Sequence, residues 1–224
     1  MPQQTLTPRV NASSALRDAG VDVIDVSEYT GQTTVFDRPA APEVSLRPSL
    51  GFPEILGGRV KSLHPKIHGG LLADPTTPSH LEDLAKHDIG SIDLVACNLY
   101  PFGLNPGIAN IDIGGQTMLR AGAKNHIACT VLSSPAQYGS VMEAMGAAEP
   151  GQPPTVPLAL REGLAAEAFA HTAQYDAEIA AWMAREKGLR EKGSIPENFF
   201  GVAQKHQGPN GPGPRPSPAL NCGP

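Results

Sequence analysis

A short basic segment holds the residue types that bind anions. It runs from Gly58 to Gly70 and contains two lysines, one arginine, two histidines and three glycines around Pro65. So polar and so rich in glycine, the segment is a poor interior for a helix or a strand. Its cations and backbone N–H groups suit an anion, because a phosphate needs positive charge and converging donors. The segment therefore favours binding of an anionic ligand.

Two later segments hold groups that can donate, accept or move protons. The first is Cys-Asn-Leu-Tyr-Pro-Phe at 97–102, and it follows an apolar stretch that predicts a buried strand. The second begins with Asp112, passes through a pair of glycines at 114–115 and ends with Lys-Asn-His at 124–126. Ligands bind beyond the carboxyl ends of strands in open α/β sheets, so these segments are candidates for a site.

The three segments, in this order, resemble the IMP cyclohydrolase domain of the family that joins AICAR transformylase to IMP cyclohydrolase. The family pattern reads GRVKTLHPxxHGGLL, DLVxxNLYPF, IDIGGxTMxRAxAKNH and AFxHTAxYDxxI. The stretches in register with it are 58–72, 93–102, 111–126 and 168–179. The resemblance covers 51–184 strongly and 15–31 weakly. Four segments in the family's order make an accidental match improbable.

Predicted strands alternate with predicted helices along the chain, which indicates an α/β fold with a mostly parallel central sheet. Strands are expected at 21–26, 92–97 and 128–132, and helices at 15–20, 79–87 (with Ser79 as N-cap), 117–123, 136–145 and 158–184. The resemblance implies a methylglyoxal-synthase-like domain of three layers.

The reaction implied by the resemblance belongs to purine biosynthesis. It is the ring closure of FAICAR, a formylated aminoimidazole carboxamide ribotide, to IMP with loss of water. An amide nitrogen is a weak nucleophile and the formyl oxygen becomes an oxyanion, so the site needs hydrogen-bond donors and an acid/base group. No cofactor or metal is required by this chemistry. The small-molecule partner is then a ribonucleotide, FAICAR or IMP.

The resemblance assigns the catalytic roles to four residues. Lys124 matches the proton donor/acceptor, Lys61 a cation near the oxyanion, Tyr100 a donor to it, and Asp112 a carboxylate that orients a lysine or accepts from the substrate amide. Each also has a structural interpretation: a solvated lysine, a core tyrosine, a helix N-cap for Asp112 and a lysine at a helix C-terminus for Lys124. The substrate-binding positions implied by the match are Arg59, Val60, Lys61, Ser62, Cys97, Asn98, Asp112, Ile113 and Gly114.

Two histidines four residues apart raise the question of a metal. His64 and His68 would share one face of a helix, but Pro65 and the glycines argue against a helix there. No further Cys/His cluster supports them, so we expect no metal site. His171 is expected to pack or cap structure.

Departures from the family pattern divide the chain. Residues 1–14 diverge where the family has its phosphate-binding loops, 15–200 form the cyclohydrolase-like domain with an insertion at 32–50, and 201–224 form a Gly/Pro-rich tail expected to be disordered. Loss of the phosphate loops would weaken ligand anchoring. A catalytically impaired nucleotide-binding relative therefore stays as an alternative. A methylglyoxal synthase on the same fold is a third hypothesis, which the segments 98–102 and 111–115 disfavour. The transformylase activity is not carried over.

Composition limits the partners. The net charge of −5 gives no overall basic field for nucleic acid, and no apolar run is long enough to span a bilayer. Three cysteines without CxxC spacing favour a reducing compartment. We expect a cytoplasmic protein, with an organellar transit peptide left open, and the resemblance implies a homodimer.

Overall fold

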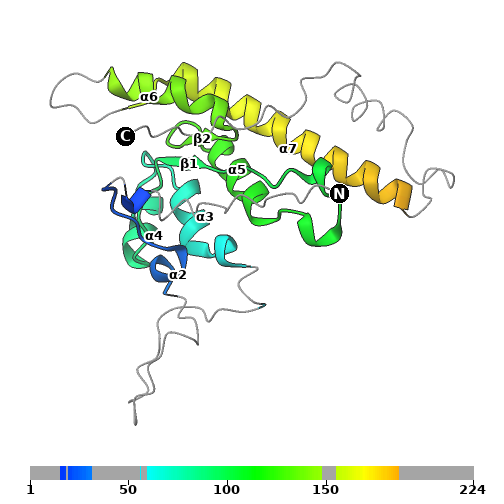
Figure 1. Ribbon diagram of the computed structural model, residues 1–224. Helices are drawn as coiled ribbons and strands as arrows, with labels where there is room; N and C mark the ends of the chain where they lie inside the picture. Colours follow the sequence, from blue (N-terminus) through cyan, green and yellow to red (C-terminus); the bar gives the residue numbers. More distant parts are fainter. Residues whose placement is uncertain (1–15, 19, 32–55, 57–59, 148–154, 187–224) are drawn as a thin grey trace, which may run out of the picture. The chain divides into compact units, whose positions relative to one another are not determined.

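The computed structural model describes residues 16–18, 20–31, 56, 60–147 and 155–186 (Figure 1), with only the main chain at residue 61. The chain divides into two compact units, 1–64 and 65–224, each described by itself below. The predicted segments 1–14, 32–50 and 201–224 lie outside the described residues, so the domain boundaries stay predictions.

The first unit contains a short helical turn at 16–18 that a glycine ends, as predicted. Gly20 has φ +79°, and its N–H donates to the carbonyl of Arg17, while the N–H of Val21 donates to the carbonyl of Leu16. This pattern closes a helix with a residue that has no Cβ penalty in the left-handed region.

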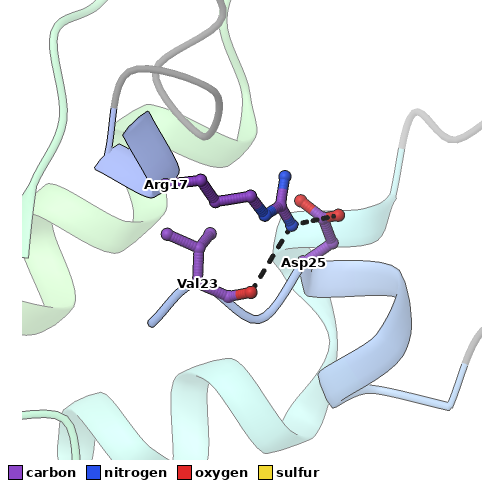
Figure 2. A network of polar contacts seen from close by, with 3 residues as sticks. All are labelled: Arg17, Val23 and Asp25. Carbon is purple, nitrogen blue, oxygen red and sulfur yellow. Dashed lines mark hydrogen bonds and ion pairs between the residues drawn. The ribbon is translucent and has the colours of Figure 1, made fainter. Parts of the chain in front are cut away.

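The prediction of a strand at 21–26 is wrong. Residues 21–25 have no regular structure, and helix α2 (Val26–Tyr29) begins at the last residue of the predicted strand. No strand among the described residues pairs with this stretch, and an isolated strand leaves its backbone groups without partners. Instead, Arg17 Nη2 donates to the Val23 carbonyl at 3.4 Å and to Asp25 Oδ2 at 2.9 Å (Figure 2). The 3₁₀ helix η3 (Lys61–Leu63) completes this unit and contacts α2.

The second unit is built on two parallel strands, which confirms the α/β class. Strand β1 (Leu94–Ala96) pairs with β2 (Thr130–Leu132), with Val95 opposite Val131. All of β2 is buried, whereas β1 buries only Val95, so the expectation of a fully buried first strand is met in part.

Helix α5 (Gly114–Lys124) connects the two strands, and α7 (Leu158–Glu186) packs on α5 and β2 (Figure 1). α5 contacts both strands, α3 and α7, and α7 also contacts β2. Close packing of α5 on the sheet requires a glycine, since a Cβ on Gly122 would lie 2.6 Å from Val95 Cγ1. The core of the unit is made by Leu71, Val95, Phe102, Leu119, Cys129, Val131, Leu132, Val141, Leu164 and Ala168.

The remaining elements surround this core. They are α3 (Pro65–Leu72), α4 (Pro78–Lys86), η4 (Phe102–Leu104), η5 (Ile108–Asn110), η6 (Pro135–Gln137) and α6 (Tyr138–Gly146). None of the helices in the described ranges is long and apolar enough to cross a membrane.

Helix α3 contradicts the expectation that the Gly-rich segment would not be helical. Pro65 begins the helix, where a proline is tolerated because its missing N–H has no partner in the first turn. Gly70 is needed for packing, since a Cβ there would lie 2.5 Å from the carbonyl oxygen of Gly90. The cost of glycine in a helix is thus offset by close contact with the following loop.

The start of α4 differs from the prediction. The N-cap of α4 is Thr77 and not Ser79, with Pro78 next. Pro135 begins the helical stretch after β2 as predicted, where Ser134 and Gln137 form a capping box. α7 matches the helix predicted at 158–184.

Candidate functional site

The end of β1 and the start of α5 meet at one point. Cys97 and Leu99 follow the strand, and Asp112 precedes the helix. A Cβ built on Gly115 would lie 2.7 Å from Asp112 Oδ2 and 2.9 Å from both Cys97 Sγ and Leu99 Cδ2. Three of the predicted segments' side chains therefore converge on a glycine backbone, at the sheet edge where α/β proteins bind ligands.

Asp112 precedes the N-cap residue of α5, which is Ile113, and pairs with the first turn of the helix. α5 begins at Gly114 and not at the predicted Thr117, and Asp112 Oδ1 accepts the Gly115 N–H at 2.7 Å. Among the described residues no hydrogen bond reaches the other oxygen, Oδ2. Asp112 is therefore not the N-cap of the structural alternative, because Ile113 takes that position, but its carboxylate still pairs with an N–H of the first turn.

A buried tyrosine of α7 holds the backbone on both sides of Ile111. The hydroxyl of Tyr175 accepts the Asp112 N–H at 2.9 Å and donates to the Asn110 carbonyl at 3.2 Å. Burial raises the pKa of Tyr175, against the hydrogen bond from Asp112, so the phenol stays protonated at neutral pH. The edge of the Phe102 ring packs on Tyr175, with ring centroids 6.2 Å apart.

A cavity of about 500 Å³ opens beside this tyrosine. Residues 99–104 form one side of it, and four residues of α7 spaced 3, 4 and 7 apart form the other: His171, Gln174, Tyr175 and Glu178. Tyr100 lines the cavity and is 55% exposed, so it is not the core tyrosine of the structural alternative. Its phenol is accessible to a ligand.

His171 is placed to meet a ligand in this cavity, although the sequence suggested only packing. It is half-buried, and desolvation lowers its pKa, with the negative charge of Glu178 acting in the opposite direction. The neutral imidazole is therefore favoured at neutral pH. Gln174 Nε2 donates to Glu178 Oε1 at 3.1 Å, so these two side chains restrain each other at the wall of the cavity.

Cys97 and Asn98 lie at the same edge of the sheet. Burial, followed by the negative charge of Asp112, raises the pKa of Cys97 to about 11, so its sulfur is a neutral thiol at neutral pH. Asn98 Nδ2 donates to the hydroxyl of Tyr138 in α6 at 3.1 Å. Its amide thus links the segments that follow the two strands.

Lys124 lies at the other end of α5. It is exposed in the last turn, ten residues after Gly114, which corresponds to about 15 Å along the helix axis. α5 returns the chain from the carboxyl end of β1 to the amino end of the parallel strand β2. Asp112 therefore lies near the carboxyl ends of the strands, and Lys124 near their amino ends. The position agrees with the alternative of a lysine that pairs with the helix dipole.

The remaining predicted binding residues divide between the units. Ile113 is 57% exposed, and Gly114 is the first residue of α5. Val60, Lys61 and Ser62 belong to the first unit, where 61–63 form η3, and Arg59 lies outside the described residues. Their part in a site stays a prediction. Within the described ranges no group of three or more His, Cys, Asp or Glu side chains could hold a metal ion.

The sequence patterns predict no role for Tyr175, Gln174 or Glu178, and for His171 they predict packing or capping. All four residues fall within the segment 168–179 that carries the family resemblance. Their spacing of 3, 4 and 7 was the available signal, because it places them on one face of a helix. The spacing alone does not show that this face of the helix lies opposite the loop 99–104.

Comparison with known proteins agrees with the resemblance. A family model described as AICARFT/IMPCHase bienzyme matches residues 122–209. The bifunctional purine biosynthesis protein PurH of Chloroflexus aurantiacus is 46% identical over 187 residues, which is 79% of this chain and 35% of that protein. PurH of a Synechococcus strain is 47% identical over 165 residues, 70% of this chain and 31% of that protein. The crystal structure of ForH aligns with a TM-score of 0.57 at 34% identity, covering 75% of this chain and 79% of that one.

The chain belongs to the AICARFT/IMPCHase family, to which the bifunctional purine biosynthesis proteins PurH belong. It spans about a third of the length of the curated PurH relatives that it matches.

Proposed function

We propose that the chain is an IMP cyclohydrolase, which closes FAICAR to IMP with loss of water. The observation that supports this most is the convergence of the 97–102 and 111–115 segments at the carboxyl edge of β1, beside a cavity that exposes Tyr100. The chain's membership of the AICARFT/IMPCHase family supports the choice of reaction. A methylglyoxal-synthase-like domain of three layers, a homodimer and a cytoplasmic location belong to the same proposal.

The proposed chemistry needs a donor and an acceptor on the two sides of the new bond. The carboxamide nitrogen attacks the formyl carbon and a C–N bond forms. The carboxamide nitrogen and the formamido nitrogen each give up one proton, and the formyl oxygen takes up two protons and leaves as water while the C=N bond of the new ring replaces the broken C–O bond. Tyr100 would donate to the developing oxyanion, and Asp112 Oδ2 would accept an N–H of the carboxamide. Both groups are available, since the phenol is exposed and Oδ2 has no partner among the described residues.

The remaining predicted residues complete the proposed site. Lys124 would transfer a proton, and Lys61 would stabilise the oxyanion. The residues that would contact the nucleotide are Arg59, Val60, Ser62, Cys97, Asn98, Ile113 and Gly114. Lys124 would have to act at a part of the ligand distant from Asp112, because about 15 Å of helix separates the two ends of α5.

Turnover of FAICAR by the full chain, followed by the absorbance of IMP, tests the proposal. Lys124→Ala should lower kcat by about a hundredfold or more if the lysine transfers a proton. Lys124→Arg is the matched control, because it keeps a positive charge at the end of α5 but cannot give up its proton at neutral pH. Wild-type rates in Lys124→Arg would remove Lys124 from the catalytic set.

A second candidate is a nucleotide-binding relative without catalytic activity. The position of Lys124 away from Asp112 favours it, because a proton donor and its acceptor must both reach the reacting atoms. Calorimetric binding of IMP by a folded chain that does not turn over FAICAR would establish this candidate and exclude the first.

A further inference from the structure

We infer that Tyr175 is a positioning residue, which holds Asp112 in the orientation that the reaction needs. The inference rests on the proposed function for its catalytic consequence. Its structural part, that Tyr175 determines where the Asp112 carboxylate lies, can be measured without any activity.

Tyr175 fixes the main chain that carries Asp112. Its hydroxyl joins the Asp112 N–H at 2.9 Å to the Asn110 carbonyl at 3.2 Å, so the turn before α5 is held at both sides of Ile111. The tyrosine is only 5% exposed. A buried hydroxyl that both donates and accepts cannot leave these groups without leaving a backbone N–H and a carbonyl unpaired.

The ring of Tyr175 is itself held in place. Phe102 packs edge-on against it, and Trp182 packs edge-on against Phe102 with centroids 5.6 Å apart. Phe102 is 2% exposed and its loop carries Tyr100. The same tyrosine therefore relates the two groups proposed to act on the substrate, Tyr100 through the ring contact and Asp112 through the hydroxyl.

The carboxylate that Tyr175 positions has little freedom of its own. One oxygen accepts the Gly115 N–H at 2.7 Å, and the other lies 2.7 Å from the place that a Cβ on Gly115 would take. A shift of the Asp112 backbone would move this oxygen directly. Displacements of about 1 Å from a distant change can lower rates by about a hundredfold.

A neighbouring side chain offers a matched control on the same helix. Asp176 Oδ1 accepts from Gln116 Nε2 at 2.9 Å, so Asp176 also ties α7 to α5 but does not contact Asp112. Loss of this bond removes a contact between the two helices but none of the hydrogen bonds of the Tyr175 hydroxyl.

The experiment compares Tyr175→Phe with Asp176→Ala in the full chain. Tyr175→Phe keeps the ring against Phe102 and removes only the hydroxyl, so the variant should fold. We expect its kcat for FAICAR to fall about tenfold to a hundredfold, with KM changed less than about threefold. Asp176→Ala should keep the wild-type kcat. A merely structural tyrosine would lower thermal stability and leave kcat of the folded protein unchanged, which would overturn the proposal.

The thiol of Cys97 reports the position of Asp112 independently of turnover. The negative charge of Asp112 contributes to the raised pKa of this thiol, so displacing the carboxylate lowers it. The pH dependence of Cys97 alkylation by iodoacetamide, followed at the peptide level by mass spectrometry, should move to lower pH in Tyr175→Phe and in Asp112→Asn, but not in Asp176→Ala.

The two readouts separate the two proposals. If the wild-type chain does not turn over FAICAR, the proposed function fails while the Cys97 measurement still decides whether Tyr175 positions Asp112. An unchanged Cys97 profile in Tyr175→Phe, with the expected shift in Asp112→Asn, would overturn the inference whatever the activity.

Discussion

Gly115 is the residue whose replacement should damage the candidate site most directly. A Cβ there would lie within 2.9 Å of Asp112 Oδ2, Cys97 Sγ and Leu99 Cδ2 at once. We expect Gly115→Ala to lower the free energy of unfolding by about 1–3 kcal/mol, the usual cost of overpacking, as measured by urea denaturation. The three neighbours would have to move apart, so kcat should fall as well.

Gly163→Ala provides the control for the Gly115 measurement. Gly163 is exposed within α7, and a Cβ there meets nothing within 4 Å. Alanine should instead raise the free energy of unfolding by about 0.5–1 kcal/mol through helix propensity. Equal effects of the two substitutions would contradict the close approach at Gly115.

At the scale of elements, the start of α5 depends on Asp112. Asp112→Ala removes the acceptor for the Gly115 N–H and should lower the free energy of unfolding by about 1 kcal/mol. Asp112→Asn keeps an acceptor, so most of this stability should remain while the charge is lost. Urea denaturation of both variants separates the role of Asp112 at the start of α5 from the catalytic one. A loss of FAICAR turnover in Asp112→Asn with stability retained would show that the charge itself is required.

Elements with a strong local pattern could be predicted and those that depend on distant contacts could not. The buried strand β2 and the long helix α7 follow from apolar runs and periodicity. The start of α5 was missed because two glycines disfavour a helix, whereas Gly115 is tolerated there by the hydrogen bond to Asp112 and the close approach of Cys97. The strand at 21–26 failed because β-branched residues form a strand only with a partner.

In the candidate site, too, the features that are local in sequence could be predicted and those that depend on distant contacts could not. The motifs predicted which segments carry Tyr100 and Asp112, because those segments are local in sequence. The sequence did not show that Tyr175, 63 residues beyond Asp112, donates and accepts beside it. It also did not show that the whole length of α5 separates Asp112 from Lys124, because the pattern predicts a helix that begins only at residue 117.

For the whole molecule, the single tryptophan of the chain gives a direct test of ligand binding. Trp182 packs edge-on against Phe102, and Phe102 lines the cavity beside Tyr100. IMP entering this cavity should change the emission of Trp182, as measured by fluorescence titration, and Trp182→Phe should remove the signal. Calorimetric binding of IMP without any change in emission would place the ligand elsewhere.

The spacing of residues along α7 has a consequence for redesign. One side of the helix buries Leu164, Ala168 and Thr172 in the core, while Gln174 and Glu178 border the cavity and are only half-buried. Under the proposed function, most of the positions that border the ligand cavity differ from those that fill the core of the same helix. A combinatorial library varied at 174 and 178 should therefore change the range of heterocycles accepted while leaving the core side chains in place.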